Sequence, residues 1–106
     1  MIRVLVYQRA KSEKDIGTLM DALRELRNEA MKQAGYITGE TLVDIKDPRN
    51  VLIISTWNTV EHYDAWNKAE PRLKATEKID HLLAEPHTEH VYGYYLTREG
   101  KVWSTL

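Results

Sequence analysis

The chain has 106 residues, with a hydrophobic fraction of 42% and a charged fraction of 29%, which suits one globular domain and leaves no room for a second. The formal net charge is −1 and the basic residues are scattered, so the chain lacks the basic stripe of a nucleic-acid binder. Cysteine is absent, which excludes disulfides and thiolate catalysis, and no apolar run reaches the ~18 residues that cross a membrane.

The sequence enters a strand pattern at once. Ile2–Arg9 is rich in β-branched residues, and the charged and apolar regions of a signal peptide are missing, so we expect a cytoplasmic location. Ser12 then begins a long helix, with Asp15 three residues later in a pattern that resembles a capping box. Apolar residues recur at helical spacing between residues 16 and 31, and Gly35 ends the helix.

The middle of the chain predicts a hairpin followed by two helical pieces. Residues 36–45 and 51–57 have strand character, and the Asp-Pro-Arg-Asn stretch between them is typical of a turn. Thr59 is the expected N-cap of a short helix, with His62 at the place of the usual Glu. Pro71 begins the next helical piece, which ends before Pro86.

A fourth strand is expected over residues 89–96, a turn over residues 98–101, and a short tail or extra strand over residues 102–106. The element order is therefore β-α-β-β-α-β, which predicts an α+β, ferredoxin-like fold with an antiparallel sheet. One domain spans residues 1–106, with its core in residues 1–95 and a tail over residues 96–106.

The predicted strands are apolar on both faces. In the third strand, Ile53 and Ile54 point to opposite sides, and in the first strand Leu5 and Tyr7 oppose the other apolar positions. Two helices cover one face of a four-stranded sheet, so the other face needs a cover, and the simplest is a second copy of the chain. We therefore expect a homodimer. The tail with Val102 and Trp103 either reaches across to the partner or folds back as a hairpin on its own sheet.

Three stretches resemble the antibiotic biosynthesis monooxygenase family. These are residues 57–66 (WNTVEHYDAW), the turn Asp47-Pro48, and residues 82–86 (LLAEP), and the resemblance extends over about residues 1–95. It implies a dimeric α+β barrel with one pocket per subunit between sheet and helices. Some members oxidise polycyclic phenols or quinols with O₂ and neither metal nor flavin, whereas others degrade haem, isomerise small molecules or have no known activity.

Trp66 is similar to the residue at this position in the haem-degrading branch. The axial His of that branch would fall near Thr76 and its first-strand Asn near Leu5, so the resemblance fails at both positions. Because haem iron needs an axial ligand, we expect no cofactor. The stretch from His87 to His90 is one residue short of a zinc motif and lies at a loop-to-strand junction, so we expect no metal site.

We predict that Trp66 and His90 are catalytic. Trp66 either lines a flat aromatic pocket or packs in the core, and His90 is the candidate base because histidine accepts a phenolic proton near neutral pH. His90 alternates with two tyrosines, which then share its face. The residues expected to bind the substrate are Tyr7, His62, Tyr63, Asn67, Arg72, His81, Tyr92 and Tyr94. The alternative is that the tyrosines line the dimer interface and the helical polar residues face solvent.

The function that follows is a cofactor-independent monooxygenase acting on a small aromatic, quinone-like or polyketide-like substrate in a buried pocket. The alternatives are a non-catalytic ligand-binding or stress-related domain on the same scaffold, and an isomerase or haem-handling relative.

Overall fold

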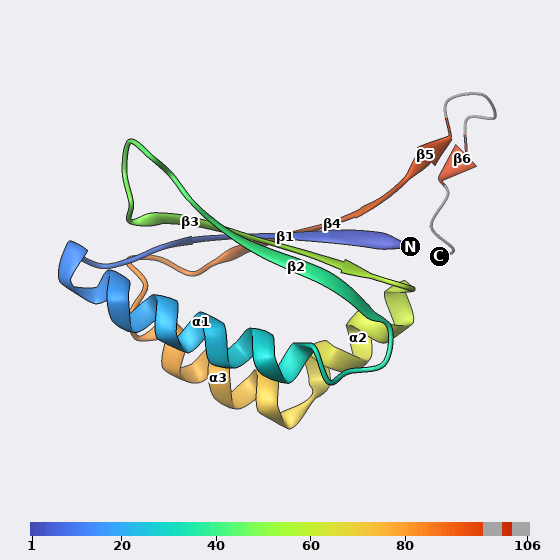
Figure 1. Ribbon diagram of the computed structural model, residues 1–106, viewed down its shortest axis with the longest axis horizontal. Helices are drawn as coiled ribbons and strands as arrows, with labels where there is room; N and C mark the ends of the chain where they lie inside the picture. The colour runs from blue at the N-terminus through green and yellow to red at the C-terminus, as the bar shows by residue number, and fades with distance from the viewer. Residues whose placement is uncertain (97–100, 103–106) are drawn as a thin grey trace.

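The computed structural model describes residues 1–96 and 101–102, and its main body is a four-stranded antiparallel sheet with helices on one face (Figure 1). The strands are β1 (Ile2–Arg9), β2 (Tyr36–Val43), β3 (Asn50–Trp57) and β4 (Thr88–Gly93), in the spatial order β2-β3-β1-β4. The helices are α1 (Ile16–Ala30), α2 (Val60–Lys68) and α3 (Glu70–Asp80). The α+β, ferredoxin-like prediction is therefore confirmed. None of the helices in the described part of the chain has the length and apolar character needed to cross a membrane.

Several helix boundaries follow the predicted local chemistry. Thr59 caps α2, because its Oγ1 accepts a hydrogen bond from the backbone N–H of His62 at 3.2 Å. Pro71 lies in the first turn of α3, where its missing N–H has no helical partner to lose. α1 ends at Ala30, before the end predicted at Gly35, and Gly35 instead lies in the turn before β2, where its φ of 84° is in the left-handed region that other residues avoid.

The start of the first helix differs from the prediction. The chain after Ser12 first forms the 3-10 turn η1 (Glu13–Asp15), and α1 begins only at Ile16. The Ser12 hydroxyl donates to the Asp15 carboxylate at 2.8 Å and makes no hydrogen bond to a backbone amide. The short Asp side chain therefore pairs directly with the serine, where the longer Glu of a capping box reaches the backbone.

The fourth strand is shorter than predicted. β4 ends at Gly93, and the next pair of residues, β5 (Tyr95–Leu96), pairs with β6 (Lys101–Val102) in a separate two-stranded sheet. Figure 1 shows this small sheet beyond the end of β4. Val102 therefore pairs in this separate sheet and not on the main sheet, where the hairpin alternative placed it, while residues 98–100 of the predicted turn and Trp103 lie outside the described part of the chain.

The strand register divides the sheet into a helix side and an open side. In β1, Val4, Val6 and Gln8 face the helices, while Leu5 and Tyr7 point to the open side, where they pair with residues of β3 and β4 that share this face. The helix side holds the two buried clusters of the core, which are Ile2, Val4, Ala30, Trp57, Tyr63 and Trp66, and Ala10, Leu19, Leu23, Val51, Ile79 and Leu83.

The open side bears apolar and aromatic side chains without helical cover. We call the set of Leu5, Tyr7, Leu42, Leu52, Ile54, His90 and Tyr92 the open face. Tyr7, Leu42 and Tyr92 expose 46%, 45% and 52% of their surface. Apolar patches of this kind mark interaction sites more often than plain surface.

A bulge in β2 changes which way Tyr36 points. Tyr36 pairs with Trp57 and Thr38 with Thr56, so Ile37 is an extra residue between two successive partners in β3. Strict alternation would place Tyr36 on the same side as Thr38. The bulge instead places it beside Trp57 on the helix side.

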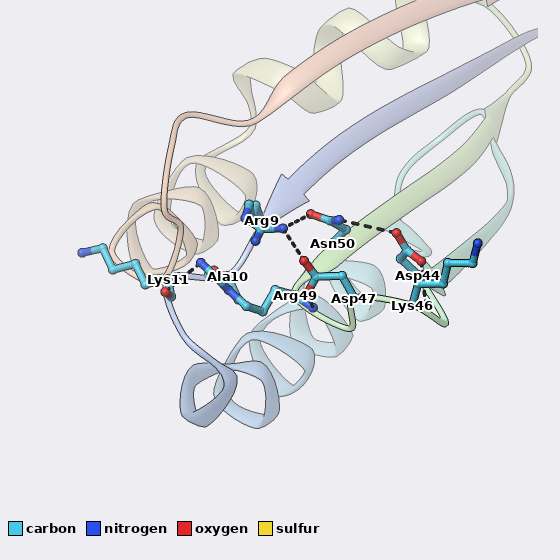
Figure 2. Close-up of polar contacts among 8 residues, drawn as sticks. All are labelled: Arg9, Ala10, Lys11, Asp44, Lys46, Asp47, Arg49 and Asn50. Carbon is cyan, nitrogen blue, oxygen red and sulfur yellow. Dashed lines mark hydrogen bonds and ion pairs between the residues drawn. The ribbon is translucent and has the colours of Figure 1, made fainter.

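Polar side chains join the β2–β3 turn to the end of β1 (Figure 2). Arg9 Nη1 donates to Asp47 Oδ2 at 2.9 Å and to Asn50 Oδ1 at 2.6 Å. Arg49 donates to the backbone carbonyls of Ala10 and Lys11 at 3.0 and 2.9 Å. We call Arg9, Asp47, Arg49 and Asn50 the hairpin latch. The hydrogen bond from Arg9 lowers the pKa of the Asp47 carboxyl below its usual range.

Candidate functional site

A cavity of about 90 Å³ lies between the helix side of the sheet and the helices. Its floor comes from β1, β2 and β3, and its roof comes from α1, α2 and α3, so every layer of the fold contributes. The lining residues used below are Val4, Val6, Gln8, Arg27, Tyr36, Gly39, Glu40, Ile53, Trp57, Tyr63, Trp66, Arg72, Thr76, Ile79 and His87.

Aromatic rings form one wall of this cavity. Trp57 and Trp66 stack with ring centroids 6.3 Å apart and an interplanar angle of 25°. Tyr63 lies 5.7 Å from Trp57, and Tyr36 meets the same ring edge-on at 5.4 Å. Trp66 is only 4% exposed. It packs in the core and also lines the cavity, so the two positions considered for it do not exclude each other.

Two buried polar atoms at the cavity have no hydrogen-bond partner among the described residues. They are Gln8 Oε1, on the strand face that Val4 and Val6 otherwise make apolar, and the Tyr36 hydroxyl. A Cβ on Gly39 would overlap that hydroxyl, so only glycine leaves room for the Tyr36 ring. Buried polar groups are almost always hydrogen-bonded, and an unpartnered pair at one cavity indicates places for a ligand or water.

A polar cluster lies beside the aromatic wall. The Tyr63 phenol lies near Glu89 and Asn67, and Arg72 pairs with Glu89 at 3.4 Å. Burial and the Glu89 carboxylate raise the pKa of the Tyr63 phenol above its usual value, because both disfavour the phenolate. Tyr63 is therefore a hydrogen-bond donor and not a proton acceptor near neutral pH. Asn67 Oδ1 is buried without a partner in the described part of the chain.

The structure does not gather the predicted site residues in one place. Trp66, Tyr63 and Arg72 line the cavity, and Asn67 adjoins it through Tyr63. His90 lies on the open face, 6.1 Å from the Tyr7 ring and 6.3 Å from the Tyr92 ring.

The remaining predicted residues lie elsewhere. His62 packs over Gly35 and its Nδ1 lies 2.8 Å from Thr59 Oγ1, while His81 is exposed at the end of α3. Tyr94 follows the end of β4, so it does not continue the alternation of His90 and Tyr92. Trp66 and His90, both predicted to be catalytic, lie on opposite sides of the sheet, so within one subunit they do not line the same cavity.

Sequence reasoning missed Gln8, Tyr36 and His87 as cavity residues. The signal for Gln8 is a polar residue on the strand face of Val4 and Val6, where burial requires a partner. His87 lies in the loop before β4 and was considered only in relation to a metal. Tyr36 depends on the bulge, for which the sequence has no clear marker.

Candidate metal ligands are not clustered in the described residues, although His87, a residue type that ligates haem iron, lines the cavity. No group of three or more His, Asp or Glu in residues 1–96 and 101–102 is arranged to hold a metal ion. Thr76, at the place of the axial His in the haem-degrading branch, does line the cavity, but its hydroxyl is not an axial haem ligand.

Comparison with known proteins agrees with the fold and with the resemblance in the sequence. The antibiotic biosynthesis monooxygenase family model matches residues 1–78, while no curated protein matches the sequence. A solved antibiotic biosynthesis monooxygenase superposes with a TM-score of 0.82 at 18% identity, covering 91% of this chain and 100% of the other.

Two more solved structures have the same fold. A conserved protein from Methanosarcina mazei Go1 gives a TM-score of 0.81 at 15% identity, with 86% of this chain and 89% of the other covered. A mutant of SnoaB, a cofactor-independent oxygenase from Streptomyces nogalater, gives 0.79 at 8% identity, with 86% and 89% covered. At such identities the superpositions establish the fold alone. The match of the family model over most of the sequence shows that the chain belongs to the antibiotic biosynthesis monooxygenase family.

Proposed function

We propose that the protein is a cofactor-independent monooxygenase whose substrate is a small aromatic, quinone-like or polyketide-like molecule. The observation that supports this most is the cavity between sheet and helices, whose wall is built from Trp57, Trp66 and Tyr63 and at which two buried polar atoms lack partners among the described residues. Flat aromatic walls with a small number of polar groups suit a planar hydroxylated ring.

The size of the cavity limits how the substrate enters. A cavity of about 90 Å³ is smaller than the roughly 150 Å³ void that accommodates one benzene ring in another protein. A ring-sized substrate therefore binds only when side chains or helices shift outward. The roof is suited to this movement, because α2 and α3 are joined through Ala69, whose backbone is extended.

In the proposed reaction the protein supplies a base, a dry pocket and hydrogen bonds. The base removes a proton from a hydroxylated ring and leaves an electron-rich carbanion. A carbanion carbon transfers electrons to O₂ and forms a C–O bond as a peroxide. Loss of water from the peroxide leaves a carbonyl, so that a CH₂ carbon and O₂ become C=O and H₂O. The substrate itself provides the electrons, and no flavin or metal enters this balance.

Oxygen uptake tests the proposal. Anthrones, quinols and phenols are offered with dissolved ¹⁸O₂ and no added metal or flavin. We expect one substrate class to consume oxygen, with one labelled atom in the product and the other in water. Trp66→Ala should weaken substrate binding, because a large part of the aromatic wall is lost. Absence of uptake and of label across the whole panel contradicts the oxygenase.

A non-catalytic ligand-binding protein is the second candidate. The unpartnered Gln8 and Tyr36 atoms favour a bound ligand whether or not a reaction follows. Saturable quenching of the tryptophan fluorescence by aromatic ligands, without oxygen uptake, would favour this candidate over the oxygenase.

We also propose that the chain forms a homodimer through the open face. The exposed Tyr7, Leu42 and Tyr92 side chains and the half-buried Leu52 and Ile54 support this, because a second copy is the simplest cover for them. The cytoplasmic location remains a prediction from the sequence.

A further inference from the structure

One end of the cavity has a polar character that the aromatic wall lacks. Tyr7 pairs with Thr88, so the antiparallel register brings His87 to the position opposite Gln8, just before β4 begins. Both side chains line the cavity, together with Thr76 of α3. We call Gln8, Thr76 and His87 the polar end.

Gln8 at the polar end requires a hydrogen-bond donor. Its side chain is 9% exposed, and its Oε1 is buried without a partner among the described residues. A carbonyl oxygen only accepts hydrogen bonds. Leaving such an acceptor unpaired after desolvation is costly, so a ligand that brings an O–H or N–H gains affinity at this point, whereas a carbonyl or ether oxygen does not.

His87 is placed to receive the proton of that donor. Its Nδ1 lies 3.8 Å from the Asp80 carboxylate at the end of α3, and His87 also lines the cavity. With Nδ1 on the side of Asp80, we take Nε2 as the ring nitrogen that meets a ligand. The Asp80 carboxylate beside Nδ1 can hold the ring in the orientation that turns Nε2 to the ligand.

Other charged groups surround the cavity but are less suited to this role. Arg27 of α1 and Arg72 of α3 are cations and accept no proton, and Glu89 of β4 is engaged with Arg72 at 3.4 Å. Glu40 of β2 pairs with Ile54 and so belongs to the open side by register. His87 is thus the titratable group at the polar end that can both accept a proton and release it.

We propose that Gln8 and His87 recognise a ring hydroxyl of the ligand, with His87 as the base and Asp80 as the residue that positions it. This inference rests on the proposed function and adds to it a named base and a required functional group. The hydroxyl turns from Gln8 Oε1 to His87 Nε2, its O–H bond breaks, and the electron pair stays on the ligand oxygen. The phenolate then accepts a hydrogen bond from the new imidazolium N–H, while Gln8 Oε1 is again without a donor, so His87 alone favours the phenolate. The phenolate and the imidazolium are the only new charges, and they cancel.

Anaerobic calorimetry with matched ligands tests the recognition. Phenol should bind wild-type protein roughly tenfold or more tightly than anisole, its methyl ether, because the ether has no donor. Gln8→Met, which keeps the length of the side chain, should abolish most of this preference. Since this change removes an unpaired buried acceptor, its thermal stability should equal or exceed that of wild type. Gln33→Met, on a glutamine outside the cavity lining, is the matched control.

The base is tested with 4-nitrophenol, whose phenolate absorbs visible light. Binding to wild-type protein should increase the phenolate fraction at a fixed pH, His87→Gln should remove the increase, and Asp80→Asn should reduce it. A change that only disturbs packing would weaken binding without altering the spectrum of the bound ligand. His90→Gln compares the base predicted from the sequence in the same assay.

The outcomes distinguish this inference from the oxygenase itself. A phenol preference that depends on Gln8, with a phenolate signal that depends on His87, supports the inference even if no substrate consumes oxygen. Equal binding of phenol and anisole by wild-type protein, no binding of either, or a signal lost only in His90→Gln overturns it. Oxygen uptake that persists at the full rate in His87→Gln would retain the oxygenase and exclude His87 as its base.

Discussion

The two sides of the sheet are built from similar residue types but differ in what covers them. On the helix side, Trp57, Tyr63 and Trp66 are buried around a cavity. On the open side, Tyr7 and Tyr92 lie half exposed beside His90. Because neighbouring residues of a strand point to opposite sides, a shift of one position moves a side chain from one environment to the other. Residue type alone therefore does not identify the functional side.

The largest expected contrast between the two sides is in folding stability. Trp57→Ala should lower the free energy of unfolding by about 3–5 kcal/mol, because the ring is buried among Tyr36, Tyr63 and Trp66. Tyr92→Ala on the open face should change it by about 0.5 kcal/mol or less in the monomer. Urea denaturation at a low protein concentration measures both, and equal losses would contradict the division into two sides.

A charge placed on the helix side should affect folding, whereas a charge placed on the open side should affect dimer formation. Ile53 faces the helices and Ile54 the open face, so the two neighbours form a matched pair. A buried unpaired charge costs several kcal/mol, so Ile53→Asp should lower the melting temperature strongly. Ile54→Asp should keep the fold and prevent dimer formation. Light scattering that gives the monomer mass of 12.4 kDa for wild-type protein would exclude the proposed dimer.

Alkaline pH should reveal the burial of Tyr63. The folded state raises the pKa of this phenol, so its contribution to stability is present below the ordinary tyrosine pKa of about 10 and is lost as the pH rises above it. The unfolded chain then ionises while the folded chain does not. Tyr63→Phe should therefore lose less stability than wild type between about pH 8 and about pH 11. Parallel curves for the two proteins in urea denaturation would contradict this.

The smallest expected effect lies outside both sides, in the hairpin latch. Arg9 lowers the pKa of Asp47 in the folded state, so the stability from this pair is present above the ordinary carboxyl range near ~4 and is lost as the pH falls through it. Asp47→Asn should make the protein slightly less stable at neutral pH and flatten its loss of stability in acid. Asp64→Asn, on an exposed position of α2, is the control, and an identical acid profile for Asp47→Asn and wild type would refute the expectation.

Strand and helix order were accessible from the sequence, because periodicity and capping are local signals. The spacing of apolar residues predicted α1, and Thr59 and Pro71 marked boundaries that the structure confirms, whereas α1 ends at Ala30 and not at Gly35. The first-turn pairing of Ser12 with Asp15 was not accessible, because a capping pattern does not say whether the side chain bonds a backbone amide or another side chain.

The site was less accessible, because it depends on which side of the sheet each residue faces. The bulge at Ile37 moves Tyr36 to the helix side, and no residue in the stretch marks it. Alternation correctly grouped His90 with Tyr92, but nothing in the sequence said that this face is turned away from the helices. Gln8 was the available clue, since it is a polar residue on an otherwise apolar strand face.

The hairpin latch has a consequence for the order in which the chain folds. Its side-chain contacts join residues that are 38, 39 and 41 positions apart, so each closes a long loop. Such loops are costly to close until β1 and β3 have already paired. Contacts that form after the transition state for folding affect the unfolding rate more than the folding rate. Loss of Arg9 should therefore shorten the lifetime of the native fold while leaving the speed of its formation nearly unchanged.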